Sequence, residues 1–500
     1  MQDAIPRFTG PAARTADTFA HCIGGARVRS SGHFEVIDPS TGLAFAQAPN
    51  ADQEQLNMAV RAARNAFPSW SSLSWNERGT YLQRFAAAID AERDGLAGLL
   101  TREQGKPLPD AQAELQRAID NFRAYSRQQL RPRILRENDR ERIEEHYRPC
   151  GVAAVISPWN VPVNLFALRA GPLLQSGNTV VAKPSPYTPL TTLRIGELAA
   201  SIFPPGVLNV IAGRDPLGQW LSEHPDVDRV SFTGSVRTGK LVMAAAAGTL
   251  KRVGLELGGN DPAIVLDDVD VEAVAQRLIS KALWNCGQVC MAVKRIYVPD
   301  GIYEPMVQAL GRLARGMKVG NGLEPGTQLG PLQNRMQFDY VRALVEETAA
   351  TAGVRIVAGG KPLERPGYFI APTIVGDIDD GARLVREEQF GPVVPVLRYT
   401  VLADAVRRAN STRFGLGASV WSSDPRRAAS VAAQLEAGTV WVNDHAVLEA
   451  DIPFGGWKES GIGRGNGELG LQSCMESTVL RVPKLAVAAG TPDPAARSRP

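Results

Sequence analysis

The chain has 500 residues, of which 44% are hydrophobic and 21% charged, a composition typical of a globular protein with two or three domains. Its formal net charge of +3 is small for this length, which argues against a nucleic-acid or membrane-surface partner. Eight arginines fall within residues 123–148, but acidic residues interleave with them, as on a solvated or intersubunit surface.

The five cysteines are scattered and odd in number, so we expect neither a disulfide framework nor a metal site. Residues 1–10 lack a charged start followed by an apolar run, and no stretch reaches about 18 apolar residues. These features predict a reduced, cytoplasmic protein without a membrane span.

The N-terminal part changes from β-prone to helical patterns along the chain. Residues 1–20 are small and polar, and we expect them to be loosely ordered. Short β-prone pieces in residues 24–45, broken by Gly- and Pro-containing turns, predict hairpin strands. Apolar residues recur at helical spacing in residues 52–127, where Pro68 and Gly105-Lys106-Pro107 are expected to separate the helices.

Short, continuous apolar runs then alternate with helical segments, which predicts parallel α/β sheets with helices on their faces. The first series of runs comprises residues 152–156, 179–182, 208–211 and 229–232, with a helical segment at 190–203. A second series comprises residues 263–266, 295–298 and 393–397. The Ala/Pro/Arg-rich tail, residues 486–500, is expected to be disordered.

Small or polar loops follow each strand of the first series. They are Ser157-Pro158-Trp159-Asn160, Lys183-Pro184-Ser185, Gly213-Arg214 and Gly234-Ser235. Ligands of open parallel sheets bind at the carboxyl ends of the strands, and a Gly-Ser turn before a helix favours phosphate. Four such loops in succession predict a dinucleotide site.

A carboxylate and a thiol lie 34 positions apart, in Glu256-Leu257-Gly258-Gly259-Asn260 and Gly287-Gln288-Val289-Cys290. A thiolate is a strong nucleophile, and a carboxylate can act as general base for a second step, so the pair indicates covalent catalysis through a thioester. The residues alone leave other interpretations open. Cys290 could be a small core residue, Glu256 a salt-bridged strand end, and Asn160 a turn residue.

The chain resembles the aldehyde dehydrogenase superfamily over about residues 23–483. Seven motifs carry the resemblance: Pro158-Trp159-Asn160, Lys183-Pro184-Ser185, Phe232-Thr233-Gly234-Ser235, Glu256-Leu257-Gly258-Gly259-Asn260, Gly287-Gln288-Val289-Cys290, Glu388-Gln389-Phe390-Gly391-Pro392 and Pro453-Phe454-Gly455-Gly456. It implies oxidation of an aldehyde to its acid with reduction of NAD or NADP, by the hydrolytic branch of the family.

The resemblance also implies roles for individual residues. Cys290 would attack the aldehyde, the Asn160 amide and the Cys290 N–H would stabilise the oxyanion, and Glu256 would activate the hydrolytic water. The implied cofactor contacts are Ile156, Ser157, Trp159, Lys183, Ser185, Gly213, Gly234, Ser235, Glu388 and Phe390, with Lys183 and Glu388 at the two riboses. A solvated surface charge is the alternative for these last two. Arg169 and Glu468 resemble a proton relay, for which a structural ion pair is the alternative.

Three structural units follow from the resemblance. They are a Rossmann-like cofactor domain (residues 20–126 and 149–258), a second α/β catalytic domain (259–456) and a small β element for oligomerisation (127–148 and 472–485). The last unit implies a dimer or tetramer.

Two departures from the family pattern bear on specificity. Pro186 stands where NAD-specific members carry a glutamate that would repel a 2′-phosphate, so we expect use of NADP as well as NAD, with Lys183 and Arg214 near the phosphate. Val161, Leu165 and Leu168 would line an apolar tunnel with Phe454 and Trp457 nearby. An aliphatic or aromatic aldehyde is therefore expected, and one bearing a carboxylate is not.

Two alternative functions remain open. An acylating enzyme would pass the thioester to coenzyme A, but that branch commonly lacks the base that Glu256 provides. A catalytically silent structural protein on the same fold would have no need for Cys290, Glu256 and Asn160 together.

Overall fold

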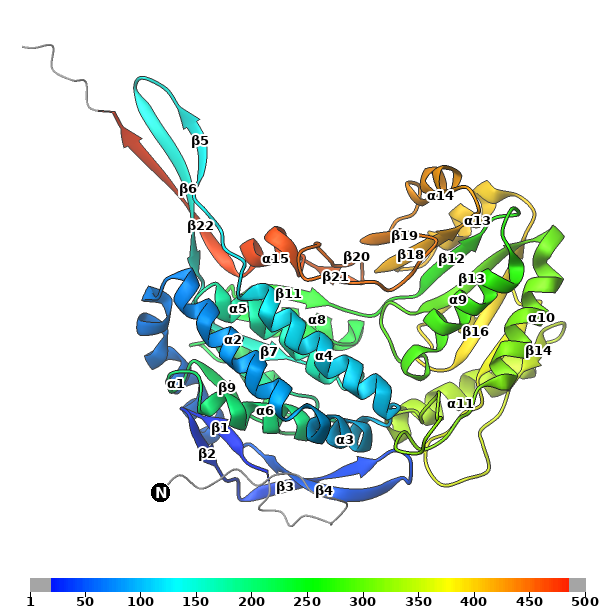
Figure 1. Ribbon diagram of the computed structural model, residues 1–500, viewed down its shortest axis with the longest axis horizontal. Coiled ribbons are helices and arrows are strands. Elements are labelled where there is room, and N and C mark those ends of the chain that lie inside the picture. Colours follow the sequence, from blue (N-terminus) through cyan, green and yellow to red (C-terminus); the bar gives the residue numbers. More distant parts are fainter. Residues whose placement is uncertain (1–18, 485–500) are drawn as a thin grey trace, which may run out of the picture.

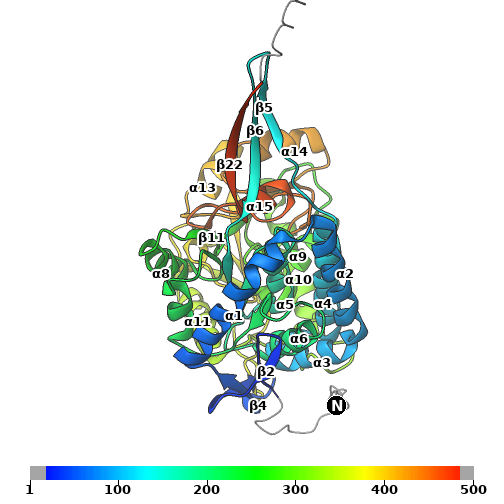
Figure 2. The ribbon, with the colours of Figure 1, turned by 90° about the vertical axis from the view of Figure 1, so that its left-hand side faces the viewer.

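The computed structural model describes residues 19–484. Two α/β lobes lie side by side, and a three-stranded sheet projects from them as an arm (Figures 1 and 2). Phe19 and Ala20 are buried, so the loosely ordered start expected for residues 1–20 is wrong at these two positions. The rest of that start, and the tail 486–500, lie outside the described residues.

Strands and helices of the N-terminal part follow the predicted order. The strands are β1 (His21–Ile23), β2 (Ala26–Val28), β3 (Gly32–Asp38) and β4 (Leu43–Asn50), and the helices are α1 (Gln53–Ser72), α2 (Trp75–Ala91), α3 (Arg93–Gln104) and α4 (Leu108–Tyr125). Capping boxes begin α1 at Asp52 and α2 at Ser74. Pro68 lies inside α1 and does not end it, contrary to expectation. The Gly105 region does separate α3 from α4.

The first large sheet has the strand order β2-β1-β9-β8-β7-β10-β11-β21. Its further strands are β7 (Val152–Ile156), β8 (Thr179–Lys183), β9 (Leu208–Val210), β10 (Arg229–Thr233), β11 (Arg252–Glu256) and β21 (Gly461–Ile462). The helices α5 (Pro162–Gln175), α6 (Leu190–Ala200), α7 (Leu217–Glu223) and α8 (Val236–Ala247) connect them. Strand order reverses between β7 and β10, so a crevice for ligands is expected beyond their carboxyl ends.

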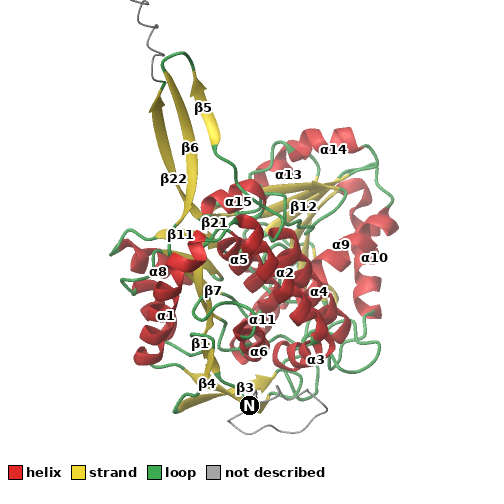
Figure 3. Cartoon of the chain, turned by 60° about the vertical axis from the view of Figure 1, so that its left-hand side comes forward, coloured by secondary structure: helices red, strands yellow, loops and turns green. Residues whose placement is uncertain are grey.

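The second large sheet has the strand order β14-β15-β16-β13-β12-β18-β19. These strands are β12 (Asp261–Val265), β13 (Val293–Pro299), β14 (Arg355–Ala358), β15 (Thr373–Gly376), β16 (Val393–Tyr399), β18 (Gly417–Trp421) and β19 (Thr439–Val442). The helices of this lobe are α9 (Val271–Leu283), α10 (Asp300–Gly316), α11 (Arg335–Ala349), α12 (Arg383–Arg386), α13 (Leu402–Ala409) and α14 (Pro425–Ala432). All of its strand pairs except β14–β15 are parallel, as predicted for strands buried by helices (Figure 3).

The arm consists of β5 (Arg133–Glu137), β6 (Glu141–Pro149) and β22 (Met475–Pro483), with β22 paired to β6 along its length. Before β22 the chain forms the short antiparallel pair of β17 (Phe414–Gly415) with β20 (Trp457–Lys458), then β21, then α15 (Gly467–Ser473). Through β21 the segment following the second sheet returns to the first, beside β11. None of the helices within residues 19–484 is long and apolar enough to cross a membrane.

Candidate active site

A tight left-handed turn presents Cys290. Asn285, Cys286 and Gly287 all have positive φ, of 52°, 58° and 71°, a conformation that costs energy for the two non-glycine residues. Gly287 is required there, because a Cβ would lie 2.2 Å from the carbonyl oxygen of Gly391. Cys286 is buried in the core of the second lobe, while Cys290 is partly exposed to a pocket.

Glu256 and Cys290 face each other across this pocket. Burial raises the pKa of the Cys290 thiol well above its ordinary value, and the nearby Glu256 carboxylate raises it further. Burial also raises the pKa of Glu256, although Arg169 opposes that shift. Arg169 Nη2 lies 3.5 Å from Glu256 Oε2, and Glu256 Oε1 is buried without a hydrogen-bond partner in the described chain. The thiol is therefore neutral at rest, and Arg169 favours the charged form of Glu256, the form that can accept a proton from it.

Asn160 joins the same pocket from the loop between β7 and α5. Its Nδ2 donates to the carbonyl oxygen of Gln288 over 2.9 Å, which leaves its second amide hydrogen available. The Asn160 carbonyl oxygen accepts from Lys106 Nζ at 3.0 Å and from Asn285 Nδ2 at 2.9 Å. Asn160 is thus fixed on both its main chain and its side chain.

Lys106 and Glu114 form a fully buried ion pair behind Asn160, which sequence reasoning missed. Glu114 Oε1 also accepts from the backbone N–H groups of Val163 and Asn164 at the start of α5. A carboxylate there complements the helix dipole. The only sequence signal was Gly105-Lys106-Pro107, which predicts a turn and nothing about Asn160.

The pocket is a narrow cavity of about 40 Å³. Besides Asn160, Glu256, Cys290 and Arg169, it is lined by Val161, Asn164, Leu165, Leu168, Trp284, Val289, Met291, Leu448, Phe454, Gly465 and Asn466. The three predicted lining residues on α5 and its first turn are therefore present, as is Phe454. Trp457 is not part of the lining and lies on β20, where it is 46% exposed.

Glu388 and Phe390 lie beside the Cys290 loop. Glu388 Oε1 accepts from the Gly259 N–H at 3.0 Å and lies 3.6 Å from Lys294 Nζ. Lys294, a second residue that sequence reasoning missed, donates to the carbonyl oxygens of Val289 at 2.8 Å and Cys290 at 2.5 Å. The buried Lys294 ammonium thus connects Glu388 to the backbone of the Cys290 loop.

The predicted dinucleotide loops follow the adjacent strands β9, β8, β7 and β10 and so lie along one edge of the first sheet. Ile156 ends β7 and Ser157 follows it, beside β8 and its Lys183, whose carbonyl oxygen accepts from the Ser157 N–H. Trp159 follows on the same loop, with its ring 5.4 Å from that of Phe390. Gly213 follows β9, and Ser185 follows β8.

Two features of these loops fit a dinucleotide. Ser235 is the N-cap of α8 and Gly234 precedes it, so the free N–H groups of that helix are available to an anion. Lys183 is buried, and its ammonium makes one long hydrogen bond, 3.5 Å to the Pro184 carbonyl oxygen. Burial lowers the pKa of Lys183 to about 8, as expected of a cation that lacks a close acceptor in the described chain.

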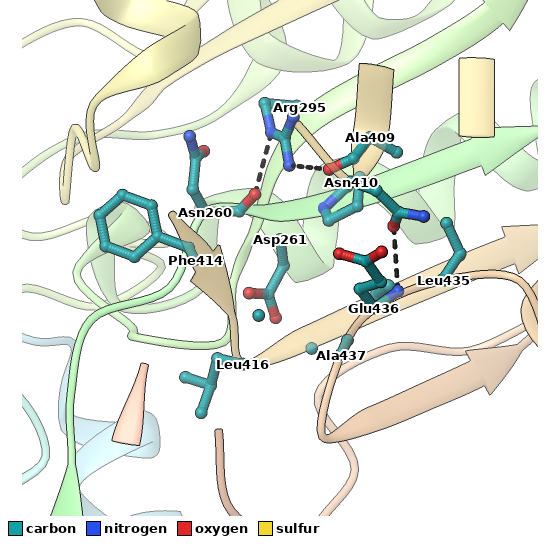
Figure 4. Close-up of a pocket in the computed structure, with 14 residues that line it drawn as sticks. Asn260, Asp261, Arg295, Ala409, Asn410, Phe414, Leu416, Leu435, Glu436 and Ala437 are labelled. Carbon is teal, nitrogen blue, oxygen red and sulfur yellow. Dashed lines mark hydrogen bonds between the residues drawn. The ribbon is translucent and has the colours of Figure 1, made fainter. Parts of the chain in front are cut away.

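The glycine-rich segment after Glu256 is held by the second lobe. Arg295 donates to the carbonyl oxygens of Asn260 at 2.9 Å and Ala409 at 3.0 Å (Figure 4). The cavity beside it, into which the Asp261 carboxylate points, measures only about 10 Å³. It is too small for an organic ligand, since even one water needs roughly 10–15 Å³.

Glu468 does not join the site. It is exposed on α15 and accepts from Gln472 Nε2, and within residues 19–484 Arg169 pairs with Glu256 rather than with Glu468, so the ion pair expected as the alternative to a relay is not formed. The residue next to Arg169 is Gly465, where a Cβ would lie 2.7 Å from Arg169 Nη1. Arg169 instead contacts Glu256 and, through Nε, Thr233 Oγ1 at 3.2 Å.

Comparison with known proteins agrees with this geometry. The family model "Aldehyde dehydrogenase family" matches residues 27–480. Retinal dehydrogenase 2 of Gallus gallus is 37% identical over 462 residues, which cover 90% of this chain and 89% of that protein. Mitochondrial succinate-semialdehyde dehydrogenase of Arabidopsis thaliana is 38% identical over 448 residues, covering 88% and 84%.

A solved NAD+ complex of the aldehyde dehydrogenase from Bacillus cereus superposes with a TM-score of 0.90 at 35% identity, covering 93% of this chain and 96% of that one. The residues matched by the family model, 27–480, include both large sheets, apart from β1 and the first residue of β2, and the strands of the arm up to residue 480. A bound NAD+ in the solved relative is in line with the dinucleotide loops described above. The chain therefore belongs to the aldehyde dehydrogenase family and is an NAD(P)-dependent enzyme that oxidises an aldehyde to its carboxylic acid.

Proposed function

We propose that Cys290 is the nucleophile and Glu256 the base of this reaction. The thiol is neutral at rest and faces the carboxylate, so Glu256 takes its proton as sulfur attacks the aldehyde carbon. The product of that step is a thiohemiacetal on Cys290. The observation that carries the proposal is that a partly exposed thiol and a buried carboxylate line the same pocket.

The oxyanion of the thiohemiacetal lies at the free amide hydrogen of Asn160. Its other Nδ2 hydrogen is directed to Gln288, and Lys106 and Asn285 fix its carbonyl, so the donor is preorganised. Such donors act where charge develops, and loss of one costs ~100- to 1000-fold in rate.

The residues proposed to hold the dinucleotide are Lys183 and Ser185 at the adenosine end, Gly213, Gly234 and Ser235 at the phosphates, and Ile156, Ser157, Trp159, Glu388 and Phe390 toward the nicotinamide. When bound, the cofactor supplies the acceptor for the aldehyde hydride. A thioester on Cys290 remains after hydride loss. Glu256 releases the thiol proton to solvent and then takes a proton from water as the water oxygen attacks the thioester carbon. The carbon–sulfur bond breaks to give the acid, and Glu256 returns its proton to the leaving Cys290 sulfur.

The substrate proposed is an aldehyde with an apolar aliphatic or aromatic body. Val161, Leu165 and Leu168 form one wall of the narrow pocket, with Phe454 also in the lining. Among the described residues that line the pocket, Arg169 is the one cation; it is already paired with Glu256, so it is not available to a substrate carboxylate.

The arm is proposed to join subunits into a dimer or tetramer of a cytoplasmic enzyme. Its outer strand β5 is exposed along its whole length, and so are several apolar side chains: Ile134, Leu135, Val479, Leu480 and Val482. Exposed strand edges with apolar residues are normally covered by a partner. The first lobe and its sheet then form the cofactor domain, and the second lobe forms the catalytic domain.

Two cysteine variants test the chemistry. Cys290→Ala should abolish aldehyde-dependent NAD(P)H formation across a panel of aldehydes, because no other thiol lines the pocket in the described chain. Cys286→Ala, four residues away in the core, should retain turnover. Turnover that survives in Cys290→Ala would overturn the mechanism, and a wild type inactive with every aldehyde would favour a silent protein. Faster thioester release with coenzyme A than with water would favour the acylating branch.

A further inference from the structure

A second cavity lies behind Glu256, on the side away from Cys290. It measures about 210 Å³, room for several waters or one small oxyanion at roughly 30 Å³ per water. It shares Leu168, Arg169, Glu256, Phe454 and Gly465 with the substrate pocket, so the two cavities meet at the Arg169–Glu256 ion pair.

Residues of β10 and β11 form one side of this cavity, and the pairing of the two strands decides which side chains face it. Alternate residues of a strand share one face, so Arg229, Ser231 and Thr233 of β10 point the same way. In the parallel pairing with β11, Arg229 lies beside Arg252 and Ser231 beside Gly254. Because Gly254 has no side chain, the Arg229 guanidinium occupies that space; a Cβ there would lie 2.9 Å from Arg229 Nη2.

Arg229 is a buried cation without a counter-charge. It is only 7% exposed, and within residues 19–484 no carboxylate lies within ion-pair distance of it. Its Nη2 reaches only Ser473 Oγ at 3.5 Å, and its Nε is buried with no hydrogen-bond partner. A guanidinium does not deprotonate in proteins, so burial without an anion is costly.

The other charged groups around the cavity do not neutralise the Arg229 guanidinium. Arg169 is paired with Glu256, and Arg252 with Glu476. Arg464 also lines the cavity and donates to the carbonyl oxygens of Gly456 and Gly463. Two guanidinium groups, those of Arg229 and Arg464, thus face the cavity with no carboxylate paired to either in the described chain.

We propose that this cavity is a binding site for a small oxyanion, a carboxylate or a phosphate, held by Arg229 with Ser231, Ser473 and Arg464. Guanidinium groups bind both anions through paired, charge-assisted hydrogen bonds. Two sources share this chemistry: the acid product, which forms next to the shared wall at Glu256, and inorganic phosphate from solution. The site is independent of the roles proposed for Cys290 and Glu256, because binding there requires no turnover.

Calorimetric titration of the full chain with acetate and, separately, inorganic phosphate tests the site. Saturating NAD is present so that the phosphate-binding loops are filled. We expect saturable binding of one oxyanion per chain, weakened at least ~10-fold in Arg229→Met. The matched control is Arg426→Met, the same change at an exposed arginine on α14, which should bind as the wild type does.

Gly254→Val provides a second test if Arg229→Met does not fold. It fills the space beside the guanidinium without changing charge, and a β-branched residue suits a strand. It should weaken binding to a similar degree. Binding of acetate alone would identify the product carboxylate as the source, and binding of phosphate alone would identify inorganic phosphate. No binding to the wild type, or equal binding in Arg229→Met and Arg426→Met, overturns the proposal.

Discussion

Lys106 Nζ donates to the backbone carbonyl oxygen of Asn160 over 3.0 Å, and the same ammonium is paired with the buried carboxylate of Glu114. Glu114 in turn accepts from two N–H groups at the start of α5. One ion pair therefore connects α4, the pocket at Cys290 and the helix that lines it. It accounts for how a loop residue such as Asn160 can be held rigidly enough for the oxyanion-stabilising role proposed for it.

Removing one partner of this pair should damage both stability and catalysis. Lys106→Met leaves the Glu114 charge buried and unpaired, which typically costs about 3–5 kcal/mol in the free energy of unfolding. Asn160 also loses a main-chain anchor, and a shift of about 1 Å in a catalytic group can lower kcat by ~100-fold. Chemical denaturation and steady-state kinetics measure the two effects.

The double variant Lys106→Met/Glu114→Gln separates them. It removes both charges, so stability should recover in part, whereas kcat should stay low because Asn160 still lacks the main-chain anchor that Lys106 provides. Full recovery of kcat in the double variant would show that Lys106 does not position Asn160.

Glu256→Gln should allow thioester formation and cofactor reduction but block hydrolysis of the thioester. The amide cannot take a proton from water, and loss of a general base costs ~100- to 10,000-fold. Rapid mixing should still show reduced cofactor approaching one equivalent per active site, more slowly than in the wild type, followed by little turnover. Mass spectrometry should find an acyl group on Cys290. Steady turnover at the wild-type rate would exclude Glu256 as the base for deacylation.

The charge of Arg169 should set the acid side of the pH–rate profile. Burial raises the pKa of Glu256 and Arg169 opposes this shift, so removing the cation raises that pKa further. Only the carboxylate acts as base; hence in Arg169→Gln the rate of thioester hydrolysis should fall off at a higher pH than in the wild type. Arg169→Lys keeps the charge and should keep a profile close to the wild type. An unchanged acid limb in Arg169→Gln would contradict the coupling.

Pro186 should permit use of NADP. It follows Ser185 in the loop after β8, close to the buried Lys183, and it carries no charge that would repel a 2′-phosphate. Pro186→Glu should lower kcat/KM for NADP at least ~10-fold by like-charge repulsion and spare NAD. Pro186→Gln, of the same size without the charge, is the control. A wild-type kcat/KM ratio above ~100 in favour of NAD would contradict dual use.

Much of the chemistry could be read from local sequence. The apolar runs predicted strands of both sheets, because a strand that is buried on both faces carries apolar side chains on both and shows no alternation with polar residues. The loops after these strands were expected together because parallel strands end at one edge of a sheet. Cys290, Glu256 and Asn160 were identified by resemblance to a family, and the structure brings all three to one pocket.

Local sequence was misleading where a helix end or the direction of a side chain depends on the rest of the fold. Pro68 was expected to end a helix that in fact continues for four more residues. Glu468 was matched to a relay, yet its side chain points to solvent, and the neighbour of Arg169 is Gly465. A short stretch of sequence does not determine which face of a helix or turn becomes buried in the folded chain.

By itself, then, the sequence determined the α/β fold, and it singled out the loops proposed to hold the cofactor and the proposed pair Cys290 and Glu256, since these depend on strand patterning and on short motifs. Only the tertiary structure decided that Lys106 and Glu114 support Asn160, and that Gly254 leaves room for the buried Arg229. These relationships join elements distant in the chain, and their geometry comes from strand register and side-chain packing, which arise only when the whole chain is folded.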